Sequence, residues 1–125
     1  MTSKVKQSLP TQRVRVRSQV PRDGLLILGM HRSGTSALSG TLAKLGAMPP
    51  KTLMPPFQDN PKGYFESTSL VQLHDDLLAS AGTSWSDWRQ FNQDWYATSV
   101  AQEFKERARA LLASEFGNSP LFVLK

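Results

Sequence analysis

Residues 29–36 read Gly-Met-His-Arg-Ser-Gly-Thr-Ser, a spacing that suits anion binding. They follow a short apolar run, Leu25–Leu28, and precede leucines at helical spacing, so they form a turn between an expected strand and an expected helix. Glycines permit a turn tight enough to wrap an anion. The N–H groups of residues 33–36 would then point at the anion from the positive end of the helix dipole. The alternative is a turn with a purely structural role.

The frame of this turn is that of phosphate-binding P-loops: Gly, four residues, Gly, one residue, then Ser or Thr. One position departs from it. Nucleotide hydrolases place there the lysine that reaches the β- and γ-phosphates, whereas this chain has Thr35. The cation lies inside the loop instead, as Arg32, whose guanidinium can direct two N–H donors onto one oxyanion. The loop therefore predicts an anion site with a charge geometry unlike that of a triphosphate site.

Three segments together resemble the bacterial-type sulfotransferase family. The first is the turn at 29–36, in which Arg-Ser-Gly-Thr-Ser is the most specific part. The second is Asn-Pro-Lys-Gly-Tyr-Phe-Glu at 60–66, and the third is Leu-His-Asp-Asp-Leu-Leu at 73–78. The resemblance covers residues 24–125 and implies a P-loop-type three-layer α/β/α fold with a parallel sheet, of which this chain is an incomplete, N-terminal half.

The resemblance also implies the co-substrate, 3′-phosphoadenosine 5′-phosphosulfate (PAPS), and a small-molecule or glycan acceptor with a hydroxyl or amine group. It implies that the loop cradles the 5′-phosphosulfate and that Arg32 and the loop amides stabilise charge on the leaving phosphate. The transfer needs no metal. The family's 3′-phosphate site would begin after the strand at 121–125, beyond the last residue. The cofactor-binding residues implied are His31, Arg32, Ser33, Gly34, Thr35 and Ser36.

The acceptor must lose a proton as it attacks, so a general base is required. Related sulfotransferases use a Glu or a His. Glu66 is our choice because it ends the second family-like segment, and with Arg32 it makes up the expected catalytic pair. Its alternative role is electrostatic, in the first turn of the following helix. His74, His31 and Asp59 are the other candidates, although His74 borders an apolar face and fits packing or capping better.

The remaining patterns predict a mixed α/β domain with a parallel sheet. Leu25–Leu28 fits a strand buried on both faces, and Leu121–Leu124 fits a second strand. We expect a helix ending at Gly46, a proline-rich loop over 47–63, a helix capped by Ser67 or Thr68 and ended by Gly82, and a helix from about Thr98 to Phe116. The inward residues expected on the last helix are Val100, Phe104, Ala108, Leu111 and Leu112. The residues expected in an apolar cluster or a substrate wall are Trp85, Trp88, Phe91 and Trp95.

The charge is unevenly distributed along the 125 residues. Net charge is +5, with 15 basic and 10 acidic side chains, yet six basic residues and no acid lie in residues 1–22. We therefore expect a basic, flexible tail over 1–23, with a short edge strand around Val14 and Val16, and a nearly neutral domain over 24–125. The tail lacks the aromatic residues that stack bases, which argues against nucleic acid. Its composition also fits an organelle transit peptide.

Composition narrows the function classes further. Without cysteine there is no disulfide framework, thiolate nucleophile or Cys-ligated zinc. No apolar run is long enough for a membrane span or a signal peptide, so we expect a cytoplasmic protein. Two alternatives to the sulfotransferase stay open: a small P-loop nucleotide kinase or NTPase, and a non-enzymatic module that binds RNA or lipid through its basic tail.

Overall fold

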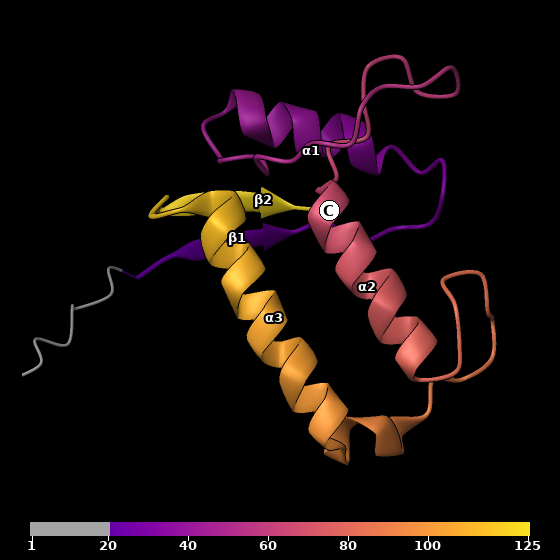
Figure 1. Ribbon diagram of the computed structural model, residues 1–125. Helices are drawn as coiled ribbons and strands as arrows, with labels where there is room; N and C mark the ends of the chain where they lie inside the picture. Colours follow the sequence, from indigo (N-terminus) through magenta and orange to yellow (C-terminus); the bar gives the residue numbers. More distant parts are fainter. Residues whose placement is uncertain (1–20) are drawn as a thin grey trace, which may run out of the picture.

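The described part of the chain alternates strands and helices in a mixed α/β arrangement. The structure, a computed structural model, describes residues 21–125. It contains a two-stranded parallel sheet and three α-helices, as the sequence predicted. The elements, in chain order, are β1 (Asp23–Leu26), α1 (Thr35–Lys44), α2 (Thr68–Ser80), the 3-10 helix η1 (Gln93–Ala97), α3 (Ser99–Phe116) and β2 (Leu121–Leu124) (Figure 1).

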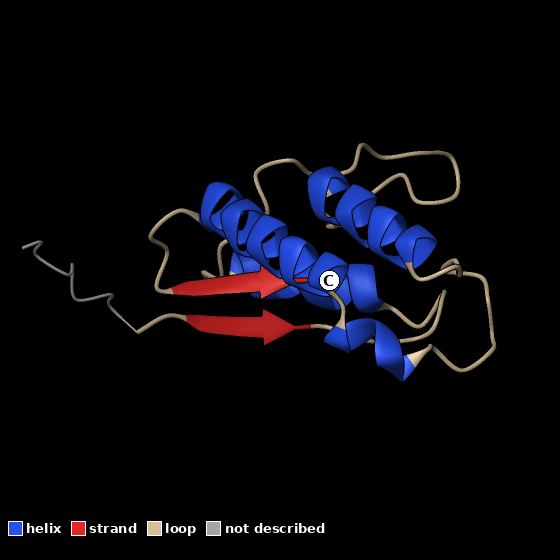
Figure 2. Ribbon diagram, turned by 60° about the horizontal axis from the view of Figure 1, so that its bottom comes forward, coloured by secondary structure: helices blue, strands red, loops and turns tan. Residues whose placement is uncertain are grey.

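β1 and β2 lie side by side although most of the chain separates them (Figure 2). They pair in parallel, with Asp23 opposite Leu121, and the Ile27 amide extends the ladder by donating to the Leu124 carbonyl at 2.8 Å. On the other edge of β2, Met48 donates to the Leu121 carbonyl and accepts from the Val123 amide, both at 2.9 Å. β2 therefore has hydrogen-bonded neighbours along both edges.

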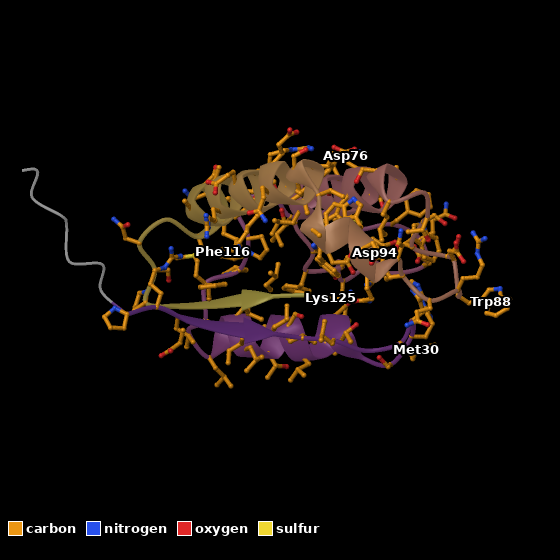
Figure 3. All side chains as sticks on the ribbon, turned by 90° about the horizontal axis from the view of Figure 1, so that it is seen from below. Met30, Asp76, Trp88, Asp94, Phe116 and Lys125 are labelled. Carbon is orange, nitrogen blue, oxygen red and sulfur yellow. The ribbon has the colours of Figure 1, made fainter. Side chains whose placement is uncertain are left out.

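The helices cover both faces of this sheet. In Figure 3 the strands lie between α1 on one side and α2 with α3 on the other. Alternate residues of β2 serve the two layers, as strand geometry requires. Val123 packs with Ile27 and Ala47 on the α1 side, whereas Phe122 and Leu124 pack on the cluster formed by α2 and α3. The predicted second strand is thus confirmed, and it links the two small cores.

The first strand differs from the prediction. β1 begins at Asp23, inside the segment expected to be tail, and all four of its residues are exposed; Leu26 is 62% exposed. The expectation that Leu25–Leu28 is buried on both faces is wrong, because only Ile27 reaches a core. The outer edge of β1 pairs with no other strand among residues 21–125. The edge strand predicted around Val14 and Val16 lies outside the described residues.

The helix boundaries follow local capping signals. Ser67, rather than Thr68, caps α2, since its hydroxyl accepts from the Leu70 amide at 3.1 Å. Thr98 caps α3 in the same way. The inward face of α3 starts at Ala101 rather than at the expected Val100, which is exposed, because Ala101 lies one turn before the buried Phe104.

The tryptophans do not share one environment. Trp95 is buried against α2 and α3, and its indole N–H donates to the Ser80 hydroxyl at 3.0 Å. Phe91 packs on the same cluster. Trp85 and Trp88 are exposed, the latter by 93%, so the predicted apolar cluster holds only for Trp95 and Phe91.

A buried carboxylate anchors the proline-rich connection between α1 and α2. Glu115, on α3, is 2% exposed and accepts from the Thr52 amide at 2.9 Å and from the Thr52 hydroxyl at 2.5 Å. Thr52 also bonds to Ser67, and the Met54 amide donates to the Glu66 carbonyl at 2.8 Å. These contacts clamp residues 52–54 against residues 66 and 67, next to the start of α2, and so fix the position of Glu66.

Candidate functional site

The turn between β1 and α1 is compact and uses unusual backbone conformations. Arg32 and Gly34 both adopt positive φ, at 63° and 87°. The Ser33 hydroxyl and amide both donate to the Met30 carbonyl, at 2.5 and 3.3 Å. A Cβ on Gly29 would lie 2.7 Å from Cγ2 of Thr35, so glycine is needed where the turn closes onto the helix.

The main-chain N–H groups at the start of α1 have no protein acceptor within residues 21–125. Leu38 is the first to bond back, to the Gly34 carbonyl at 3.0 Å, and no side chain caps the helix. The amides of Thr35, Ser36 and Ala37 are the unpartnered donors that every helix leaves at its N-terminus. The prediction that residues 33–36 all offer free amides is wrong for Ser33, because its amide donates to the Met30 carbonyl.

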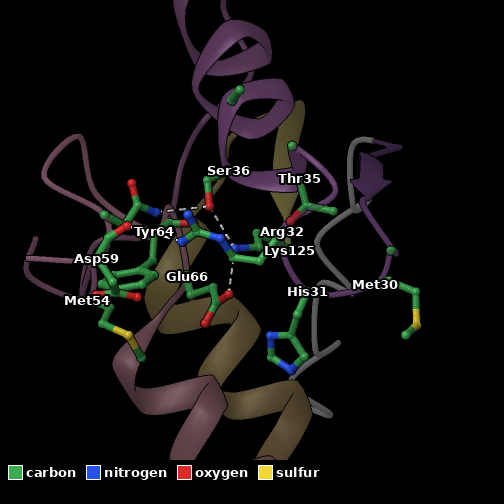
Figure 4. Close-up of a pocket in the computed structure, with 14 residues that line it drawn as sticks. Met30, His31, Arg32, Thr35, Ser36, Met54, Asp59, Tyr64, Glu66 and Lys125 are labelled. Atoms are coloured by element: carbon green, nitrogen blue, oxygen red, sulfur yellow. Dashed lines mark hydrogen bonds and ion pairs between the residues drawn. The ribbon is translucent and has the colours of Figure 1, made fainter. Parts of the chain in front are cut away.

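A cavity of about 590 Å³ is lined by the residues that carry these amides, and Figure 4 shows Thr35 and Ser36 among its lining residues. Its wall joins the turn, the connection before α2, and the end of β2. The side chains that Figure 4 labels come from all three segments. The lining residues are Gly29, Met30, His31, Arg32, Gly34, Thr35, Ser36, Ala37, Met54, Asp59, Asn60, Tyr64, Glu66 and Lys125.

Lys125 is a site residue that the sequence analysis missed. Its ammonium group lies 2.6 Å from Oε1 of Glu66, and it donates to the Ser36 hydroxyl at 2.9 Å and to the Tyr64 carbonyl at 3.1 Å. A signal was available in the sequence. The carboxyl ends of parallel strands meet at one edge of a sheet, so the residue after β2 must lie near the turn that follows β1.

Arg32 forms no ion pair with a carboxylate among residues 21–125, where its one hydrogen bond is to the Asp59 carbonyl, at 3.2 Å. The Asp59 carboxylate instead accepts from the Tyr64 hydroxyl, and this hydrogen bond raises the pKa of Tyr64 above its usual value. The remaining N–H donors of the guanidinium are therefore available to a ligand.

A close contact between α1 and the connection sets the position of Glu66. The ring of Phe65 lies directly on Gly40, where a Cβ would be only 2.8 Å from the ring. Phe65 itself adopts a positive φ of 56°. The absence of a side chain at Gly40 lets this segment approach α1, and the neighbouring side chains of Tyr64 and Glu66 then line the cavity.

The structure brings most of the predicted site residues together. Among the candidate bases, Glu66, His31 and Asp59 line the cavity, whereas His74 is exposed on α2 and lies outside it. The His31 ring packs edge-on against Trp85, with 5.4 Å between ring centroids. The residues predicted to bind the cofactor that line the cavity are His31, Arg32, Gly34, Thr35 and Ser36; Ser33 alone does not.

Comparison of the chain with protein-family models, with curated proteins and with solved structures gave no match. Within residues 21–125, no helix is long and apolar enough to cross a membrane. The same residues contain no group of three or more His, Asp or Glu side chains placed to hold a metal ion. The expected localisation and the metal-free reaction stay predictions.

Proposed function

We propose that the cavity binds the phosphosulfate end of PAPS, and that the chain has the P-loop-type three-layer fold and the activity of a sulfotransferase. One observation carries the proposal. The residues that carry the unpartnered N–H groups at the start of α1 line one cavity together with two cations, Arg32 and Lys125, and with Glu66. Donors and a candidate proton acceptor are thus within one site.

The donor set suits an anionic group. Main-chain N–H groups at a helix N-terminus bind phosphate-like oxygens directly, and the dipole adds to the attraction. Arg32 can supply forked hydrogen bonds, and Lys125, the residue after β2, supplies a compact positive charge. The cavity volume of about 590 Å³ is in the usual range of ligand pockets. These features support a bound phosphosulfate, and the family-like segments at 29–36 and 60–66 favour it over a triphosphate.

Each of these residues would then have its own role in sulfuryl transfer. PAPS supplies an activated sulfuryl group when bound. Arg32 and the α1 amides stabilise the negative charge that develops on the oxygen left on the phosphate. Glu66 accepts the proton that the acceptor's hydroxyl or amine group loses as it attacks. Lys125, whose ammonium group donates to the Ser36 hydroxyl, neutralises part of the charge of the same anion.

A thermal-shift competition tests this proposal. Adenosine 3′,5′-bisphosphate, added without Mg²⁺, is expected to raise the melting temperature of the full chain. At a ligand concentration of about 100 times Kd the gain is about 2.7 kcal/mol, or roughly ten degrees for a domain of this size. Mg·ATP at the same concentration should give a smaller shift.

The opposite ranking would assign the chain to the nucleotide kinases or NTPases, the main competing class. No shift with either nucleotide would remove the proposed cofactor site altogether. A variant with Thr35→Lys, which restores the P-loop lysine, serves as the matched comparison. It should improve the response to Mg·ATP relative to adenosine 3′,5′-bisphosphate.

A further inference from the structure

Glu66, the proposed base, and Lys125, one of the proposed anion-binding cations, form an ion pair with each other. Oε1 of Glu66 is 2.6 Å from the Lys125 ammonium nitrogen. We propose, on the basis of the proposed function, that this ion pair acts as a latch that the anion releases. A dianion bound at the turn pairs with Lys125 in place of Glu66. The Glu66 carboxylate is then free to act as base. The sulfate-donor site would thus switch on its own proton acceptor.

The position of Lys125 supports the first half of the latch. The Ser36 hydroxyl, to which the ammonium group donates at 2.9 Å, belongs to the first turn of α1. The amide of the same residue is among the unpartnered donors of that turn. An anion bound to these amides would therefore lie beside the ammonium group, and Lys125 can reach it by a rotation of its flexible side chain.

Charge favours the exchange of partners. The attraction between an ammonium group and a second group grows with the charge of that group, so a dianion attracts Lys125 more strongly than the single charge of Glu66 does. The ion pair is also only partly shielded from solvent, with the Lys125 and Glu66 side chains 14% and 26% exposed. Such a pair can open without leaving a fully buried charge behind.

Release of Lys125 has a defined chemical consequence. While the ion pair is closed, the Lys125 ammonium group contacts Oε1 of Glu66, the oxygen that would otherwise accept a proton. Once it is open, the acceptor's oxygen or nitrogen attacks sulfur as its proton passes to Glu66. The bond from sulfur to the acceptor forms, and the bond from sulfur to the bridging oxygen breaks with its electron pair remaining on the phosphate.

A double-mutant cycle with inorganic pyrophosphate as the probe tests the latch on the full chain by calorimetry. Lys125→Met should weaken pyrophosphate binding roughly tenfold, since one charge-assisted contact is lost. Glu66→Gln should tighten it several-fold, because Lys125 is then free. In the Lys125→Met background the tightening by Glu66→Gln should vanish, because it acts through Lys125. Glu103→Gln and Lys105→Met, both exposed on α3, are the charge-matched controls and should leave binding unchanged.

Other outcomes are equally informative. If Glu66→Gln tightens binding equally with and without Lys125, the effect is general charge repulsion and the latch is refuted, while the anion site stands. If the wild-type chain does not bind pyrophosphate, the proposed function fails together with the latch. Should Lys125→Met fail to fold, NMR of the wild-type lysine ammonium and glutamate carboxyl groups replaces it. Both the Lys125 and the Glu66 signals should move on titration, and a stationary Glu66 signal would overturn the latch.

Discussion

Replacing Arg32 by alanine is expected to weaken the binding of adenosine 3′,5′-bisphosphate roughly ten- to hundred-fold, with little change in melting temperature. A hydrogen bond to a charged group contributes about 1.5–3 kcal/mol, which corresponds to this range in Kd. The side chain is exposed and makes one hydrogen bond within residues 21–125, to the Asp59 carbonyl, so its loss costs the fold little. Isothermal titration calorimetry measures the affinity.

Two companion variants make the Arg32 result specific. Arg32→Lys keeps the charge but loses the fork of donors, so its affinity should lie between those of the wild type and Arg32→Ala. Arg109→Ala removes an exposed arginine from α3, where it pairs with Glu106, and should leave the affinity unchanged. If Arg32→Ala lowers the free energy of unfolding by as many kcal/mol as the free energy of binding, Arg32 stabilises the turn and does not contact the ligand.

Replacing Glu115 by alanine is expected to lower the free energy of unfolding by about 3 kcal/mol, because it removes the buried carboxylate that accepts two hydrogen bonds from Thr52. Glu115→Gln keeps one acceptor oxygen and should cost less. Glu103→Ala, exposed on the same helix, should change stability by less than about 0.5 kcal/mol. Urea denaturation at pH 7 measures all three; equal effects of Glu115→Ala and Glu103→Ala would refute the clamp.

The same carboxylate predicts a pH dependence. Burial would raise the pKa of Glu115, but hydrogen bonds, with those from the Thr52 hydroxyl and amide the largest, outweigh burial, so the pKa is lowered from the usual 4.5. A lowered pKa contributes stability that is fully present above pH 4.5 and is lost as the pH falls through the folded-state value. The stability difference between wild type and Glu115→Gln should therefore shrink below pH 4.5, whereas a constant or growing difference would contradict this.

Features encoded by local sequence were predictable. The predictions of a turn at 29–36, a helix capped by Ser67 or Thr68, a helix from about Thr98 and a strand at Leu121–Leu124 depend on neighbours in the sequence, and the structure has these elements there. The mixed α/β class followed from the order of these elements. The glycine spacing at 29–36 also led to the prediction of an anion site at this turn, and residues of the turn line the cavity.

Features that depend on partners distant in sequence were not predictable. Leu26 is as apolar as a buried strand residue, yet its burial depends on neighbouring segments, and it is exposed. The predicted parallel sheet places Lys125 near the turn that follows β1, but its contacts with Ser36 and Glu66 join residues far apart in the sequence, which no local pattern reveals. The hydrogen bond between the Thr52 amide and the Glu115 carboxylate likewise joins two segments that are far apart in the sequence. The role predicted for the basic residues of 1–20 lies outside the described part of the chain.

The central claim is that main-chain N–H groups at the start of α1 hold the anion, and amide NMR during titration with adenosine 3′,5′-bisphosphate tests it most directly. The account predicts that the amide signals of Thr35, Ser36 and Ala37 shift furthest and saturate at the same ligand concentration. Binding that leaves these signals unmoved while others shift, in the N-terminal tail for example, would contradict it.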